Sequence, residues 1–188
     1  MTTFDLHTHE TAPKGSLDAM SGVENVMGFL PNIYAVFADS PSVIKAYTSI
    51  TQLLNRSSFS PAELQLMLLT TSAVNGCEYC VAAHTMGGKK ARLDNTVIEA
   101  IRGDIPIPDP RLAMLHKFTK SVVENRGWVT SEEVDDFVEA GFTKAQVLEV
   151  VLAVSLKTIS NYVNHFAETP LDDALEPLAW QKPVTHAA

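Results

Sequence analysis

Charged residues are scarce in this sequence, and positive charges are scarcer than negative ones. Charged residues make up 19% of the 188 residues, against 46% hydrophobic residues, and the formal net charge at pH 7 is −8. A chain with this little charge and this much apolar content is not expected to contain long disordered stretches. Because it is acidic and has no cluster of lysine or arginine, neither nucleic acid nor an anionic membrane is expected as a partner.

Long apolar runs are missing as well. The longest, residues 147–156, is interrupted by Glu149 and Ser155, and no run reaches the roughly 20 residues that a membrane-spanning helix needs. Residues 1–13 lack the apolar core of a signal peptide. These features together favour a cytoplasmic location.

Alternating apolar and polar residues, the pattern of a half-buried strand, are also absent. The residues that start and end helices predict one helix after another. Ser40-Pro41 opens a helix towards Asn55, and Ser60-Pro61 opens one that runs to about Asn75. Further helix starts and ends are Cys77 to about Lys90, Asp94 to Gly103, Asp109-Pro110 to about Gly127, and capping boxes at Thr130 with Glu133 and Thr143 with Gln146. We expect an all-α bundle of about eight to ten helices in one domain spanning residues 1–188, with residues 1–15 as a polar leader.

A linker at residues 104–110 is expected to separate two helical halves. The last long helix of the second half is expected from about Lys144 to Phe166. Apolar side chains cover most of its circumference: Val147, Leu148, Val150, Val151, Leu152 and Val154. Such a helix lies either at the centre of a core or in a subunit interface. We expect a homo-oligomer built around it.

The only two cysteines, Cys77 and Cys80, stand three residues apart, and His84 follows four residues later. Positions i, i+3 and i+7 share one helix face, so the three side chains should point the same way. The start of a helix favours a thiolate, and a nearby histidine can move protons to or from sulfur. In a reducing cytoplasm such a pair is more typical of redox or metal chemistry than of a structural disulfide.

Two other interpretations of the pair remain open. The cysteines could be small buried hydrophobic residues. They could also bind zinc with His84, but no second Cys-x-x-Cys or His-x-x-x-His completes a zinc site, and His7 and His9 lie in the polar leader, where solvated side chains are expected.

The run from Leu64 through His84, within the redox-motif segment at residues 64–90, resembles the carboxymuconolactone decarboxylase superfamily and, more narrowly, its AhpD-like alkylhydroperoxidase and peroxidase-related branch. The resemblance lies in Asn75-Gly76-Cys77-x-x-Cys80-x-x-x-His84 after an apolar helix. Less specific matches to the peroxidase-related branch are Gly28-Phe29-Leu30-Pro31-Asn32, Ser40-Pro41, the run from Asn161 to Phe166, and Thr169-Pro170-Leu171-Asp172.

This resemblance implies an all-helical dimer, trimer or hexamer that reduces organic hydroperoxides or hydrogen peroxide without a bound cofactor. Cys80 would be the sulfur that becomes a sulfenic acid, Cys77 the resolving thiol and proton donor, and His84 part of a proton relay. An external dithiol or a redox partner protein would reduce the disulfide. Lactone decarboxylases of the superfamily lack the cysteine pair, whose presence argues against that activity.

The sequence departs from the family pattern at two positions. Gln65 stands where the relay usually has a glutamate, and Tyr79 stands where a histidine often lies between the cysteines. Gln65 is the fourth candidate site residue, because a polar amide on an apolar face indicates a partner inside the site, and it can hold His84 although it cannot shuttle a proton. Glu63 is explained by its capping box with Ser60, and Glu149 is the alternative carboxylate.

The functional prediction is a thiol-dependent peroxidase. The alternative is a redox sensor or partner-binding protein that cycles the same disulfide without efficient turnover. His116 and His165 are expected to be structural histidines, with His165 a weaker candidate for lining the site or an interface.

Overall fold

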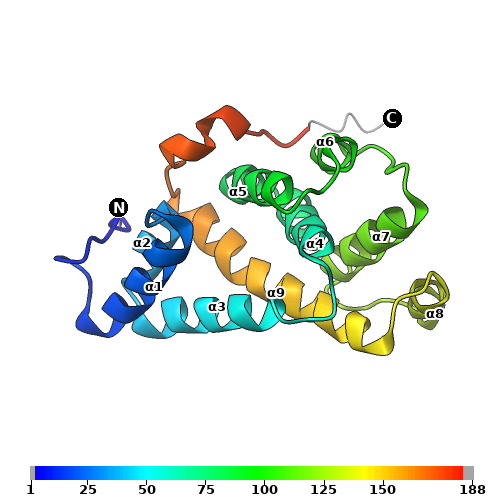
Figure 1. Cartoon of the computed structure of the whole chain (residues 1–188), viewed down its shortest axis with the longest axis horizontal. Coiled ribbons are helices and arrows are strands. Elements are labelled where there is room, and N and C mark those ends of the chain that lie inside the picture. Colours follow the sequence, from blue (N-terminus) through cyan, green and yellow to red (C-terminus); the bar gives the residue numbers. More distant parts are fainter. Residues whose placement is uncertain (1–2, 184–188) are drawn as a thin grey trace.

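The computed structural model describes residues 3–183, and in this part of the chain all regular structure is helical. The elements are η1 (Lys14–Ser16), α1 (Leu17–Met27), α2 (Asn32–Phe37), α3 (Pro41–Leu54), α4 (Pro61–Val74), α5 (Glu78–Lys90), α6 (Asn95–Gly103), α7 (Pro110–Glu124), α8 (Ser131–Glu139), α9 (Lys144–Ala167) and η2 (Asp173–Leu178), where η marks a 3-10 helix (Figure 1). The prediction of an all-α fold with eight to ten helices is confirmed.

Side-chain caps fix most of the helix starts. Ser60 and Glu63 form the expected capping box at α4, and Thr130 with Glu133 and Thr143 with Gln146 form those of α8 and α9. Each box satisfies backbone N–H groups that have no partner inside the helix, so these starts are marked in the sequence itself.

The amino-terminal region is more structured than expected. Helices α1 and α2 were not predicted, because neither begins with a side-chain cap: Ser16 makes no capping bond and the residue before α2 is Pro31. The leader is also not purely solvated. The ring of His7 lies 3.4 Å from Asp39 and is only 14% exposed, which corrects the expectation of a solvated histidine there.

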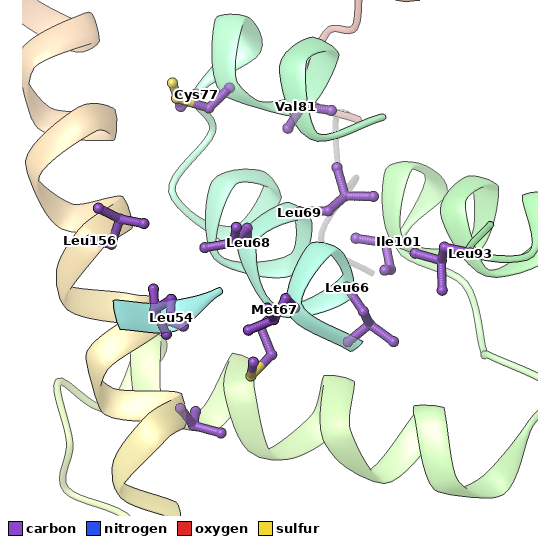
Figure 2. Close-up of a cluster of buried hydrophobic side chains, with 14 of the residues drawn as sticks. Leu54, Leu66, Met67, Leu68, Leu69, Cys77, Val81, Leu93, Ile101 and Leu156 are labelled. Atoms are coloured by element: carbon purple, nitrogen blue, oxygen red, sulfur yellow. The ribbon is translucent and has the colours of Figure 1, made fainter. Parts of the chain in front are cut away.

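Helix α4 lies at the centre of the bundle, between α9 on one side and α5 to α7 on the others. Its apolar side chains are buried around the whole circumference, and Figure 2 shows Leu68 on the side of Leu156 of α9 while Leu66 and Leu69 lie towards Leu93 and Ile101 at α6. This explains why α4 shows no amphipathic pattern: helices pack against it from every side.

Helix α9 crosses the molecule beneath α4 (Figure 1) and has two different faces. Val150, Ala153 and Leu156 are fully buried against the bundle. Leu148 and Val151, in contrast, are 71% and 46% exposed. No helix in residues 3–183 is both long and apolar enough to cross a membrane.

Candidate functional site

The cysteine pair is placed by the turn between α4 and α5. Gly76 adopts a left-handed conformation with φ of +71°, and the Cys77 N–H donates to the carbonyl of Ser72 at 2.9 Å, which closes α4 with a Schellman motif. Cys77 then becomes the N-cap residue of α5, so the helix begins at Glu78, one position after the start that the sequence indicated. Cys80 lies in the first turn, and both thiols are 2% exposed.

A polar stripe of α9 faces the two sulfurs. Lys157, Ser160, Asn161 and Asn164 stand at i, i+3, i+4 and i+7 and are all buried. The Asn164 side-chain amide lies 3.2 Å from Cys80 Sγ and 3.6 Å from Cys77 Sγ, so one amide group contacts both sulfurs. Sequence reasoning missed this stripe, although polar residues at helical spacing inside an apolar helix are the signal that could have found it.

Lys157 is the least expected member of the stripe. It is 1% exposed, and no ion pair within residues 3–183 involves its ammonium group. Burial lowers the pKa of Lys157, but Cys80, Tyr47 and Cys77, with Cys80 the largest of the three, together more than offset this and leave the pKa above its ordinary value. A buried cation normally has a charged partner, and here that partner is the cysteine.

The two thiols have opposite tendencies to ionise. Burial raises the pKa of Cys80, but the hydrogen bond from Cys77, the charge of Lys157 and the amide of Asn164 together bring it well below the ordinary value. The hydrogen bond to Cys80 and burial raise the pKa of Cys77. Cys80 is therefore the thiolate and Cys77 the protonated thiol that donates to it.

Gln65 and His84 form the contact that the sequence predicted. Gln65 Oε1 lies 3.0 Å from His84 Nδ1. A carbonyl oxygen can only accept, so Nδ1 carries the hydrogen and Nε2 is left as an acceptor. Burial, and secondly the charge of Lys157, hold the pKa of His84 well below its ordinary value, which keeps the ring neutral. Gly87 makes room for this pair, since a Cβ there would lie 2.4 Å from Gln65 Oε1.

A cavity of about 670 Å³ opens onto these groups. Its walls come from α1, α3, α4, α5 and α9, and most of the side chains are apolar, among them Val23, Met27, Leu68, Met86 and Leu156. Cys80, His84, Gln65 and Lys157 line it, whereas Cys77 is not among its lining residues. A molecule in the cavity thus meets the sulfur of Cys80 first.

Tyr79 joins the cysteine motif to the carboxyl-terminal segment. Its hydroxyl donates to Asp172 Oδ2 at 2.5 Å and accepts from the Ile33 N–H at 3.3 Å, while Asp172 Oδ1 accepts from the Asn32 N–H at 2.9 Å. Tyr79 thus has a structural role in place of the relay histidine. These bonds join the segments that contain Asn32 and Asp172 to the cysteine motif.

The remaining candidates lie away from the cavity. His116 Nδ1 is 2.9 Å from the Thr70 hydroxyl, and His165 is exposed on α9. Glu149 contacts Ser58 through its carboxylate and does not line the cavity, so it cannot serve as the alternative relay group without a large rearrangement. Within the described residues, no group of three or more histidine, cysteine or acidic side chains is arranged to hold a metal ion.

Comparison with known proteins supports the resemblance. Residues 41–108 match the model of the carboxymuconolactone decarboxylase family. Among solved structures, an uncharacterized peroxidase-related protein with an alkylhydroperoxidase AhpD core from Ralstonia eutropha JMP134 aligns with a TM-score of 0.82 at 20% identity, covering 92% of this chain and 93% of that one. A peroxidase-related protein from Silicibacter sp. TM1040 gives 0.79 at 17% identity, with 93% of both chains covered.

A third similar structure is a cysteine-to-alanine variant of the debrominase Bmp8 in complex with 2,3,4-tribromopyrrole, with a TM-score of 0.77 at 15% identity over 94% of this chain and 95% of the other. Comparison with curated protein sequences gave no match. The predicted AhpD-like fold is therefore confirmed, as is the resemblance of the segment at residues 41–108 to the decarboxylase family. Identities of this size establish the fold and leave the activity to be argued from the site.

Proposed function

We propose that this AhpD-like chain is a thiol-dependent peroxidase that reduces organic hydroperoxides through a Cys77–Cys80 disulfide cycle. The observation that carries the proposal is the position of Cys80 at the wall of an apolar cavity, where one amide contacts its sulfur and that of Cys77, and the lowered pKa of Cys80 agrees with it. The thiolate is the reactive form of cysteine, and a neighbouring thiol can resolve its sulfenic acid.

The reaction has two balanced chemical steps. The Cys80 thiolate attacks the terminal oxygen of R–O–O–H, forming an S–O bond and breaking the O–O bond, and the departing alkoxide takes a proton to become ROH. Cys77 then attacks the sulfenic acid of Cys80, the disulfide forms, and water leaves with the thiol proton of Cys77. An external dithiol returns two electrons and two protons.

The site geometry supports both steps. His84 Nε2 has no hydrogen-bond partner among residues 3–183 and could accept from the hydroperoxide O–H, which would orient the terminal oxygen towards Cys80. Asn164 contacts both sulfurs and so holds them side by side for the second step. Gln65 acts as a positioning residue, since it fixes the tautomer of His84.

The cavity favours a bulky substrate over hydrogen peroxide. A cavity of about 670 Å³ lies within the size range of small-molecule sites. Its apolar walls would accommodate an alkyl or aryl group. The substrate class that fits is an organic hydroperoxide with a hydrophobic substituent.

The test is a thiol titration of the denatured protein before and after one equivalent of cumene hydroperoxide, with the product mapped by mass spectrometry. We expect two free thiols to fall to none, with Cys77 joined to Cys80. In Cys77→Ser, a sulfenic-acid reagent should label Cys80, and in the matched Cys80→Ser variant it should label nothing. Two thiols persisting in the treated wild type would overturn the proposal, and oxidation without sustained turnover with a dithiol would favour the redox-sensor alternative.

A second candidate function is reductive debromination, favoured by the structural similarity to a debrominase with a bound tribromopyrrole. The same thiolate could take bromine from an aromatic ring to form an S–Br bond, with the ring carbanion taking a proton, and Cys77 could then displace bromide as the disulfide forms. Bromide release from a bromopyrrole together with thiol loss would support it, whereas thiol loss with hydroperoxide alone would exclude it.

A further inference from the structure

The first step of the proposed peroxidase reaction needs a proton donor, and the cavity offers few. Gln65 cannot release a proton, and His84 is neutral, with its one hydrogen directed at Gln65. The hydroxyl of Tyr79 already donates to Asp172, and burial raises its pKa above the ordinary value. Lys90 and Lys157 both line the cavity, but Lys90 is exposed, whereas Lys157 is buried and acts on the pKa of Cys80.

We propose that Lys157 is the catalytic acid of this site: its ammonium group protonates the alkoxide that leaves when Cys80 attacks a hydroperoxide, in place of the carboxylate relay. This inference rests on the proposed peroxidase function and adds the source of its proton. The net step is Cys80–S⁻ plus ROOH plus Lys157–NH₃⁺, giving Cys80–SOH plus ROH plus Lys157–NH₂.

The change in charge at Cys80 determines when Lys157 loses its proton. In the reduced state the thiolate compensates the buried ammonium group. Once Cys80 becomes a neutral sulfenic acid, that compensation is gone and burial alone acts on Lys157, which favours its neutral form. Because a buried charge without a partner is strongly unfavourable, loss of the proton is favourable at that moment.

The other groups that act on Lys157 do not replace the lost anion. They are the Tyr47 hydroxyl on α3 and the Cys77 thiol and His84 ring at α5, and none of these is a carboxylate. No ion pair within residues 3–183 offers it a carboxylate. After the dithiol reduces the disulfide, the Cys80 thiol returns its proton to the Lys157 amine, and the cycle closes without a glutamate at position 65.

Two substitutions and two oxidants separate this role from simple charge stabilisation. Arginine keeps a cation beside Cys80 but does not release its proton, so Lys157→Arg should retain the thiolate and lose the acid. Lys157→Met removes both. An alkyl hydroperoxide has an alkoxide leaving group that needs a proton, whereas a peracid has a carboxylate leaving group that does not.

The measurement is the single-turnover rate constant of thiol oxidation by tert-butyl hydroperoxide and by peracetic acid, and the decisive quantity is the ratio of the two. In Lys157→Arg we expect the alkyl hydroperoxide reaction to slow by about 100-fold or more, and the peracid reaction by less than about threefold. Lys157→Met should slow both oxidants through the lost thiolate, but its ratio should change in the same direction, because the thiolate fraction cancels. Lys144→Arg, an exposed position on the same helix, is the control and should leave the ratio unchanged.

A wild-type ratio in both Lys157 variants would overturn the inference while leaving the peroxidase intact. Wild-type protein that reacts with the peracid but not with any alkyl hydroperoxide would overturn the proposed function, and the role of Lys157 with it. If melting curves show that neither variant folds, the solvent isotope effect on the wild type decides: a larger effect for the alkyl hydroperoxide than for the peracid is expected, and equal effects would contradict the inference.

Discussion

A glutamine at position 65 gives His84 a different task from the one that a glutamate would give it. The amide accepts from Nδ1, and burial keeps the ring neutral, so His84 presents an acceptor to the cavity. A carboxylate in the same place would attract a proton to the ring, because a nearby negative charge favours the imidazolium form. The residue at this position therefore decides whether His84 orients the substrate or donates a proton.

We expect Gln65→Glu to matter only where Lys157 is absent. In the wild-type background Lys157 already supplies the proton, so hydroperoxide turnover should change by less than about threefold. In Lys157→Met, Gln65→Glu should restore turnover by about tenfold, because the new carboxylate favours the imidazolium form of His84, and the gain should be lost as rising pH deprotonates that ring. Gln52→Glu, which adds a carboxylate at an exposed position of the same cavity, is the matched control. Equal gains in both backgrounds would show that Lys157 is not the donor.

At the residue scale the sequence predicted the cysteine motif and the Gln65–His84 contact, because each follows from helical spacing within one or two neighbouring segments. Lys157 and Asn164 were missed since they lie about 80 residues further along the chain, and only the packing of α9 against α5 brings them to the sulfurs. The polar residues within α9 were visible in the sequence. Their spacing, however, does not identify the distant side chain that a lysine in an otherwise apolar helix contacts.

At the scale of elements, helices that begin with a proline or a capping side chain were predicted closely, and of the three described α-helices without either signal only α5 was predicted. The expected segment from Ser40-Pro41 to Asn55 corresponds to α3 (Pro41–Leu54), and Thr143 marks the start of α9 (Lys144–Ala167). Helices α1 and α2 lack both signals and are stabilised by the contacts they make in the bundle. Tertiary packing, which single-segment patterns do not contain, decides such elements.

The carboxyl-terminal segment is expected to depend on one buried carboxylate. Asp172 is 8% exposed and accepts from Tyr79 and from the Asn32 backbone, whereas Asp173 beside it is exposed. Asp172→Ala would leave both donors without a partner, so we expect a loss of about 3 kcal/mol in the free energy of unfolding and a fall in Tm of roughly 6–12 °C. Asp173→Ala should stay within about 0.5 kcal/mol. Similar melting temperatures for the two variants would contradict the role of this carboxylate.

At the scale of the whole molecule, the outer face of α9 is the unexplained surface. Leu148, Val151, Tyr162 and Phe166 lie along it and are 46–71% exposed. They span 18 residues, which is about 27 Å of helix, and their spacing keeps them on one side. An apolar stripe of this length is typical of an interface, and a helix face can pair with its own copy about a two-fold axis.

We propose that two copies of this chain associate through that stripe, and we expect sedimentation at micromolar concentration to show a multiple of the 20.5 kDa chain mass. Val151→Glu combined with Tyr162→Glu should shift the protein to the monomer, because it would place like charges in a face that packs against itself. Both side chains are exposed in the single chain, so the fold should melt as in the wild type. Ile105→Glu, at an exposed apolar position outside α9, is the control and should leave the assembly intact. A wild-type protein that sediments only as a 20.5 kDa species, or an Ile105→Glu variant that dissociates equally, would rule out this interface.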